Sequence, residues 1–155
     1  MMKQNIDIVV ISISSPILVG IYRDKQLHDT ISSDGKTSDI LPLIFKKILD
    51  RYNIETIYYV NGPGSYMAIK VAYIFLKTIS IMKNCNLRAI IGFELNNRSP
   101  IKALGKKYFI YNQNSKQIDI EFLSNQQIEP FRLPNSLIDL EYSENGLPNY
   151  NLPAV

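Results

Sequence analysis

A nearly continuous apolar run occupies residues 5–13, which read Asn-Ile-Asp-Ile-Val-Val-Ile-Ser-Ile. A run of this length and composition predicts a strand that is buried on both faces, as a strand at the centre of a sheet is. Turn residues follow at 14–16, and two further runs at 17–22 and 26–31 are separated by a second turn. The chain is therefore expected to open with three strands that pair antiparallel as a meander.

Helical and strand patterns alternate after this meander. Apolar residues spaced by three and four positions predict an amphipathic helix that Thr37 or Ser38 caps and that ends near Tyr52. Residues 53–55 are expected to break that helix before a β-branched and aromatic strand at 56–60. Three further elements are predicted after it: a long helix at 65–83, a strand at 87–91 and a hairpin at about 107–123.

This order of elements predicts a fold class. Helices separate the first, fourth and fifth strands, and such connections are right-handed crossovers between parallel strands. The second and third strands pair antiparallel at one edge. The fold class is therefore α/β, with the mixed sheet of ribonuclease H-like and actin-like proteins. The region after Leu123 contains four prolines and few periodic apolar residues, so it is expected to wrap around the rest of the chain.

The composition excludes several classes of site. The chain has 155 residues, of which 46% are apolar and 20% charged, so it can form one domain with a sizeable core. Cys85 is the only cysteine and His28 the only histidine, which excludes an internal disulfide, a thiolate metal cage and a histidine metal cluster. A reducing cytoplasm is the expected compartment. The uncharged stretch 8–22 has 15 residues. A spanning helix needs about 20, so no membrane association is expected.

Charge is unevenly distributed along the chain. The net charge is −1 for residues 1–35, +9 for 36–116 and −5 for 117–155. A basic segment can bind a polyanion, or it can simply keep an isoleucine-rich fold in solution, and both interpretations stay open. Segment 70–116 has nine basic residues and one acid, Glu94. If this segment touches tRNA, the expected contacts are Lys70, Lys102, Lys106 and Lys107.

The predicted helix at 65–83 is unusually apolar. On a helical wheel its polar positions Lys70, Lys77 and Ser80 gather in one narrow sector, and apolar residues fill most of the rest. A surface helix normally has a wider polar face, so this helix is expected to be covered on nearly every side. A partner protein could supply that cover, and so could the chain's own fold.

The turn Gly62-Pro63-Gly64-Ser65 joins a predicted strand to this helix. Glycines let a backbone approach an anion closely, and the free N–H groups of a helix N-terminus point toward it. Phosphate binding is therefore one interpretation of these four residues. The other is a tight turn in which Ser65 merely caps the helix. The sequence is not a Walker loop, because no Gly-Lys-Ser/Thr follows.

The residues that catalysis would need are missing. An actin-like phosphotransferase requires acids at the ends of its central strands to hold magnesium. Here the first strand ends at 11–13 and the fourth at 59–61, and neither segment contains an acid. Ser65 as a nucleophile would need an adjacent base, and His28 lies near the far end of the meander. We therefore expect no catalytic residue, no metal site and no cofactor of its own.

Four segments resemble the bacterial TsaB (YeaZ) family in one consistent order. Residues 8–14 resemble its opening Ile-Leu-Ala-Ile-Asp-Thr-Ser strand, and residues 36–42 its His-Thr…Ile-Leu-Pro helix start. Residues 62–71 resemble its Gly-Pro-Gly-Ser-Phe-Thr-Gly-Val-Arg-Ile segment, and Ile91-Gly92 resembles its Ile-Gly-Val-Ser strand end. The resemblance covers roughly residues 6–95.

The resemblance implies an actin-like first lobe at 1–95, followed at 96–155 by a reduced second lobe and a C-terminal tail. It also implies a scaffold without independent catalysis that binds TsaD, acts with TsaE, and supports threonylcarbamoyl transfer to adenosine of ANN-decoding tRNAs. The resemblance allows ATP and magnesium only within the complex with TsaD and TsaE, and it allows a homodimer when the chain is alone. Since first-lobe helices of the family pack on TsaD, the expected partner-interface residues are Ile40, Leu41, Ile44, Phe45, Ile48, Tyr66, Ile69, Tyr73, Phe75 and Leu76.

The chain departs from the family pattern at four positions. Ser12 stands where the family has Asp, Lys36 where it often has His, and Met67 and Ala68 where it has Thr and Gly. Two other functions stay open beside the scaffold. One is an autonomous actin-like nucleotide hydrolase or glycoprotease-like enzyme, and the other is a tRNA-binding module built on segment 70–116.

Overall fold

The computed structural model describes residues 2–124 and 128–149. Its regular elements in chain order are β1 (Gln4–Ile11), β2 (Ile17–Arg23), β3 (Gln26–Ser33), α1 (Thr37–Arg51), β4 (Tyr52–Val60), α2 (Tyr66–Lys83), β5 (Asn86–Ile90), the 3₁₀ turn η1 (Gly92–Glu94), β6 (Ile101–Lys102), β7 (Lys107–Asn112) and β8 (Gln117–Phe122). The predicted meander, the two helices and the late hairpin are all confirmed.

The main sheet has five strands in the order β3-β2-β1-β4-β5. Its central strand, β1, pairs antiparallel with β2 and parallel with β4. The side chains of β1 alternate between two apolar clusters, with Ile8 and Val10 in one and Val9 and Ile11 in the other, all fully buried. A strand buried on both faces is what the run at 5–13 predicts, and the α/β mixed-sheet fold class is confirmed.

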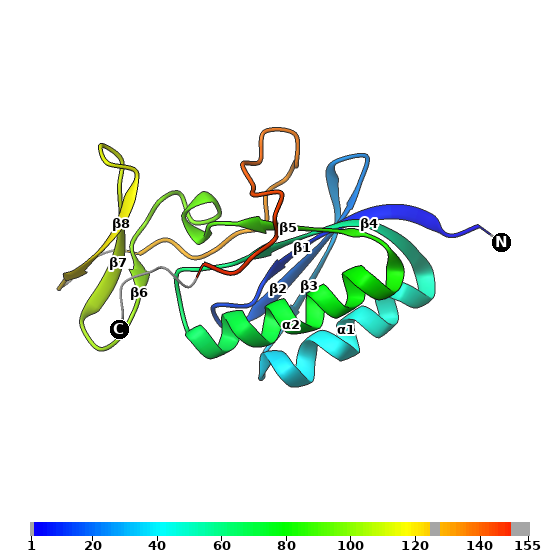
Figure 1. The fold of residues 1–155 in the computed structure, drawn as a ribbon, viewed down its shortest axis with the longest axis horizontal. Helices are drawn as coiled ribbons and strands as arrows, with labels where there is room; N and C mark the ends of the chain where they lie inside the picture. The colour runs from blue at the N-terminus through cyan, green and yellow to red at the C-terminus, as the bar shows by residue number, and fades with distance from the viewer. Residues whose placement is uncertain (1, 125–127, 150–155) are drawn as a thin grey trace.

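Both helices lie on one face of this sheet (Figure 1). They pack on it through buried side chains that include Leu41 and Phe45 of α1 and Ala72 and Leu76 of α2. Edge-to-face packing of Phe45 against Phe75 joins the two helices, with ring centroids 5.5 Å apart. No helix in the described ranges is long and apolar enough to cross a membrane.

Two local predictions were wrong. The predicted break at 53–55 does not exist, because β4 begins at Tyr52 directly after α1 and its first residues pair with the start of β1, as Asn53 does with Asn5. The pairing partner of these residues lies some 50 positions away, so local sequence could not show it. The predicted cap is also displaced: Lys36 occupies the N-cap of α1 and makes no side-chain capping bond.

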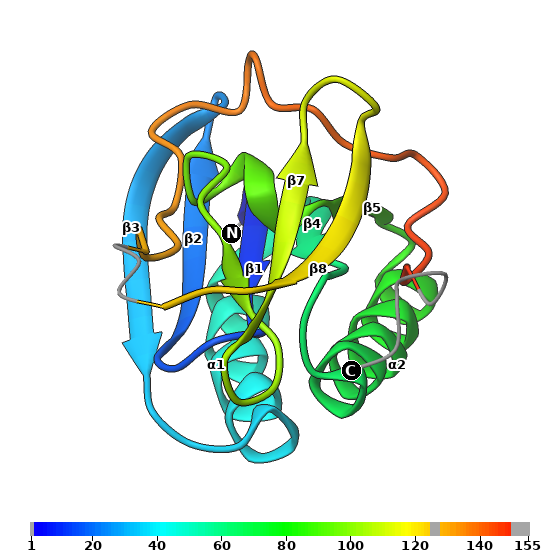
Figure 2. The ribbon, with the colours of Figure 1, turned by 90° about the vertical axis from the view of Figure 1, so that its left-hand side faces the viewer.

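The opposite face of the sheet is covered by residues 128–149, which contain no helix. This tail forms two isolated bridges, Gln26 with Ser136 beside β3 and Ala89 with Ser143 beside β5. Figure 2 shows it passing from the β2–β3 side of the sheet to the β5 side. Its own Leu137 is buried against the sheet, in the apolar cluster that also contains Val9 and Ile11. The predicted wrapping is confirmed for residues 128–149, whereas Pro153 lies outside the described residues.

A separate small sheet follows η1, with strand order β6-β7-β8. The hairpin of β7 and β8 was predicted, whereas β6 has only two residues and no recognisable pattern. Ile101 pairs with Phe109, and both side chains are buried against Phe93. This three-stranded unit corresponds to the region that the sequence assigns to a reduced second lobe.

Candidate functional site

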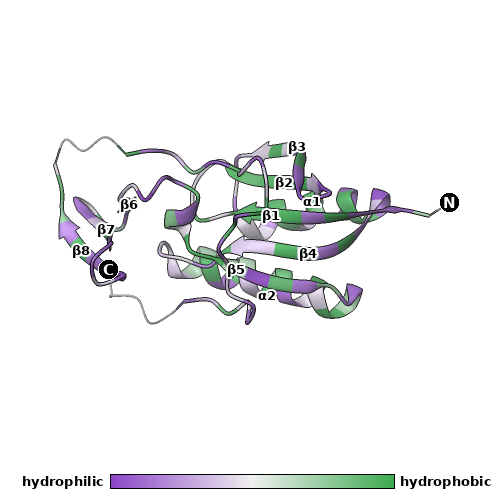
Figure 3. Cartoon of the chain, turned by 90° about the horizontal axis from the view of Figure 1, so that it is seen from above, coloured by the Kyte–Doolittle hydropathy of each residue, from purple (hydrophilic) through white to green (hydrophobic). Residues whose placement is uncertain are grey.

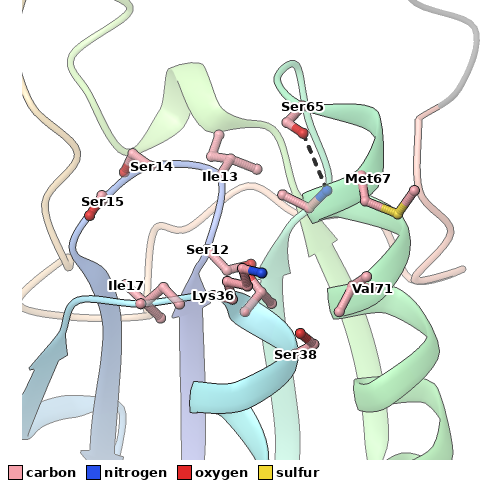
Figure 4. Close-up of a pocket in the computed structure, with 13 residues that line it drawn as sticks. Ser12, Ile13, Ser14, Ser15, Ile17, Lys36, Ser38, Ser65, Met67 and Val71 are labelled. Atoms are coloured by element: carbon pink, nitrogen blue, oxygen red, sulfur yellow. Dashed lines mark hydrogen bonds between the residues drawn. The ribbon is translucent and has the colours of Figure 1, made fainter.

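A pocket of about 410 Å³ lies where the loop after β1 meets the N-termini of α1 and α2 (Figure 4). Both β3 and β4 run in the same direction as β1. The helix α1 follows β3 and α2 follows β4, so both helices begin at the same edge of the sheet, and this brings the two N-termini together. The lining residues are Ser12, Ile13, Ser14, Ser15, Ile17, Gly35, Lys36, Thr37, Ser38, Ser65, Met67, Ala68 and Val71.

The turn at 62–65 has structural reasons for its residues. Gly62 has a φ of +139°, which side chains rarely allow. A Cβ on Gly64 would lie 3.3 Å from the Cβ of Ile13, closer than ordinary packing. Ser65 Oγ accepts a hydrogen bond from the Ala68 N–H at 3.4 Å, which makes it the N-cap of α2. Of the four residues, only Ser65 lines the pocket, so anion binding by Gly62, Pro63 and Gly64 stays a prediction.

The donor set of this pocket does not suit a magnesium nucleotide. Its lining offers hydroxyl groups and the Lys36 ammonium group but no carboxylate. The nearby Asp34 carboxylate instead accepts a hydrogen bond from Ser15 Oγ at 3.1 Å. Among the described residues there is no group of three or more metal-ligating side chains. Magnesium prefers carboxylate ligands, so we derive no reaction step through a bound metal nucleotide here.

The two side chains that could serve as base or nucleophile are poorly placed. His28 is exposed on the edge strand β3, and the register that links Leu27 through Tyr22 to Asp7 places it level with the middle of β1. Ser65 follows the carboxyl end of β4, on the other side of β1 in the sheet. Burial raises the pKa of the Cys85 thiol, which disfavours the reactive thiolate. The geometry therefore contains no activated nucleophile of the Ser–His type.

The outer surface of the helices is the second candidate, and here the structure corrects the predicted membership of the interface. Six of the ten predicted residues pack inside this chain, where no partner can touch them: Leu41, Ile44, Phe45, Ile48, Ile69 and Leu76. Tyr66 is 57% exposed, while Ile40, Tyr73 and Phe75 are half-buried. The six buried side chains pack inward because the sheet covers one full side of each helix.

Other apolar side chains are exposed in their place. Met67, Ile74 and Ile81 follow one another at seven-residue intervals on α2 and are 63%, 54% and 69% exposed. Met82 is also 69% exposed, and Leu43 on α1 is 62% exposed. The wheel of α2 could not single these out, because most of its circumference is apolar. The seven-residue interval does not single them out either, because the buried pairs Ile69 and Leu76, and Ala72 and Ile79, share it.

A groove runs beside this row, between the two helices. Its volume is about 360 Å³, and it is lined by Thr37, Ser38, Pro42, Val71, Ile74, Phe75 and Thr78. In Figure 3, apolar segments recur along the whole length of α2. The row Met67, Ile74 and Ile81 and this groove are together called the docking face below.

The predicted tRNA contacts fall on two elements. Lys102 ends β6, Lys106 lies in the following turn, and Lys107 starts β7, so these three surround one hairpin. Lys107 Nζ lies 5.5 Å from the centre of the Phe122 ring. Lys70 lies on α2, in a different layer of the molecule. Contact of tRNA with any of them stays a prediction.

Comparison with known proteins gives a structural likeness only. No family model and no curated protein matches the sequence. The structure is similar to YeaZ from Pseudomonas aeruginosa, with a TM-score of 0.57 and 10% identity over 82% of this chain and 68% of that one. It is also similar to an uncharacterized protein with similarity to peptidase YEAZ from Pseudomonas aeruginosa, with a TM-score of 0.57 and 9% identity over 76% and 64% of the two chains. The chain thus has the YeaZ-like fold and spans about two thirds of each neighbour.

Proposed function

We propose that this chain is a non-catalytic scaffold subunit of the TsaB type. It binds a TsaD-type protein, acts with TsaE, and supports threonylcarbamoyl transfer to adenosine of ANN-decoding tRNAs. The observation that carries the proposal is the docking face, an exposed apolar row on the first-lobe helix of a YeaZ-like fold. The resemblance to the TsaB family implies contact with the partner through the first-lobe helices, which are α1 and α2 here.

The exposed apolar surface on α2 is costly for a chain that acts alone. Soluble monomers rarely expose a contiguous apolar patch of several hundred square ångströms unless the patch binds something. Here Met67, Ile74 and Ile81 stand in one line, with the apolar groove directly beside Ile74. Burying such a row contributes roughly 25 cal/mol for each square ångström of apolar surface removed from water.

The pocket at the helix N-termini supports the non-catalytic part of the proposal. With Ser12 at the end of β1 and no carboxylate in the lining, the chain has no group there to hold magnesium or orient a water. Its role is then to hold its partner, and the chemistry of transfer belongs to that partner. ATP and magnesium would act only within the assembled complex.

Co-purification with TsaD from the same cell tests this function. The key variant is Ile74→Glu, which places a charge in the middle of the docking face at a position that the chain's own core does not use. A carboxylate buried in an apolar interface costs several kcal/mol, so recovery of TsaD should fall at least about tenfold. Unchanged recovery would rule out this interface.

Leu104→Glu is the matched control for that experiment. Leu104 is 64% exposed, much like Ile74, but it follows β6 in the small sheet. The same change of charge and side-chain size there should leave TsaD recovery as it is. Equal losses from both variants would point to a general effect of charge and contradict the assignment to α2.

A further inference from the structure

The docking face is bordered by positive charge. Lys70 and Lys77 are exposed and seven residues apart, so they form a row parallel to the row Met67, Ile74 and Ile81. On the helical wheel Lys70 lies about 40° and Lys77 about 60° from Ile74, both on the same side of it. From Met67 to Ile81 the apolar row rises by 14 residue steps and is about 21 Å long, at about 1.5 Å per step.

No acid balances these lysines within α2. The helix Tyr66–Lys83 contains no Asp or Glu, and in the described part of the chain none of its lysines forms a salt bridge. On the far side of the groove, α1 has the exposed Lys46, one helical turn after the groove residue Pro42. The α2 border of the docking face is therefore positive, whereas on α1 the lysine stands with the exposed acids Asp39 and Asp50.

We propose that the docking face takes a helix of a different protein whose own apolar row is flanked by acidic side chains. This inference rests on the proposed function, and it specifies the chemistry of the partner. An apolar row with a seven-residue repeat is the arrangement that packs against a second helix, and charges flanking such rows select the partner and its orientation. The acidic side chains of that helix would meet Lys70 and Lys77.

The same charges disfavour a second copy of this chain as the occupant. A two-fold dimer joins identical patches, so pairing α2 with α2 would bring Lys70 and Lys77 near the same lysines of the other copy. Pairing α2 with α1 of the other copy gives little relief. The acids of α1, Asp39 and Asp50, are exposed together with Lys46 and Lys47, so the layer as a whole stays basic.

The test uses the chain itself as the probe. The variant Lys70→Glu/Lys77→Glu keeps the apolar row and flanks it with acids, which makes it a stand-in for the proposed partner. We expect wild type alone and variant alone to sediment as monomers in about 50 mM salt. An equimolar mixture should form a 1:1 dimer whose affinity is at least about tenfold higher than that of either protein for itself. This mixed dimer should dissociate at high salt.

Two matched variants tie this result to the docking face. Lys102→Glu/Lys106→Glu makes the same change of charge on the small sheet and should not pair with wild type. Adding Ile74→Ser to the charge-reversed variant should abolish the mixed dimer, because the central apolar contact is lost. A mixture that stays monomeric overturns the proposal, as does a wild type that dimerises as strongly as the mixture.

This test separates the inference from the function on which it rests. It contains no TsaD, so a failed mixture leaves TsaD binding untouched and removes only the proposed acidic flanks. If the mixed dimer forms but the wild-type chain does not co-purify with TsaD, the proposed function is rejected. A helix with acidic flanks then remains the proposed occupant of the docking face.

Discussion

One face of the main sheet is covered by α1 and α2, whereas the other is crossed by the irregular segment 128–149. The helices bury a large continuous cluster that includes Leu41, Phe45 and Leu76. The tail buries fewer residues of its own and is held at both sheet edges by hydrogen bonds. Ser143 N–H donates to Ala89 O at 2.8 Å, and Leu27 N–H donates to Asn135 O at 2.9 Å.

The two covers of the sheet differ in the surface that they present to solvent. The helical cover closes the core on its inner side and leaves an apolar row on its outer side. The tail presents a different kind of surface, in which Tyr22 Oη donates to Pro134 O at 2.6 Å and Arg88 lies 4.6 Å from the Tyr142 ring centre. Exposed apolar side chains also occur on the tail, at Ile128, Ile138, Tyr142 and Leu147, but they do not repeat at a fixed interval. The helix side is therefore the one that offers a partner a regular apolar row.

Two substitutions on α2 should give the largest contrast. Leu76 is fully buried on the inner side, and Leu76→Ala should lower the free energy of unfolding by about 2 to 5 kcal/mol through lost burial and a cavity. Ile74→Ala on the outer side should change it by no more than about 0.5 kcal/mol. Urea unfolding of the dilute chain measures both values. Similar losses would mean that the outer row is buried in the isolated chain.

Gly146 offers the matching experiment on the tail side. Its φ is +65°, and an added Cβ would collide with the backbone carbonyl of Leu87. Gly146→Ala should therefore cost about 1 to 3 kcal/mol and make the tail a faster target for limited proteolysis.

Gly105→Ala is the control for that variant. Gly105 also has a positive φ, +59°, but nothing lies within 4 Å of an added Cβ. It should show the backbone strain of the left-handed region without the collision, and so a smaller loss. If the two variants are equally destabilised, the contact between Gly146 and β5 contributes nothing.

The helix side of the fold was largely predictable from sequence. The apolar run at 5–13 predicted a central strand, and the pattern at 65–83 predicted α2, because both depend on neighbours in sequence. The periodicity did not show which apolar residues of α2 face inward. Ile69 and Leu76 were assigned to a partner and lie in the core, since an almost wholly apolar wheel has no distinct polar side to orient it.

The tail side was predictable only as a wrapping segment. The bridges of Ser136 and Ser143 use backbone groups at the two sheet edges, and backbone groups carry no sequence signal. The same reason hid the early start of β4 at Tyr52. At the candidate site, the missing carboxylates could be predicted because they are a matter of residue type. The exposed row on α2 required the three-dimensional structure.

The smallest expected effect is the response of the tail side to alkaline pH. Burial raises the pKa of Tyr22 above its ordinary value of about 10. A hydroxyl whose pKa is raised by folding stabilises the folded state fully below the unfolded pKa, and this stabilisation is lost as pH rises through the folded value. The free energy of unfolding should therefore decline above pH 10, by less than about 1 kcal/mol near pH 10.5.

Tyr22→Phe distinguishes the source of that decline. The hydrogen bond to Asp7 also raises the pKa of Lys25, and this contribution is lost over a similar alkaline range, above the ordinary lysine value of about 10.4. The variant should thus keep part of the slope, and its unfolding free energy between pH 9.5 and 11 should fall less steeply than that of wild type in urea titrations. Identical slopes would mean that Tyr22 ionises as freely in the folded chain as in the unfolded one, so that the tail does not keep its hydroxyl from water.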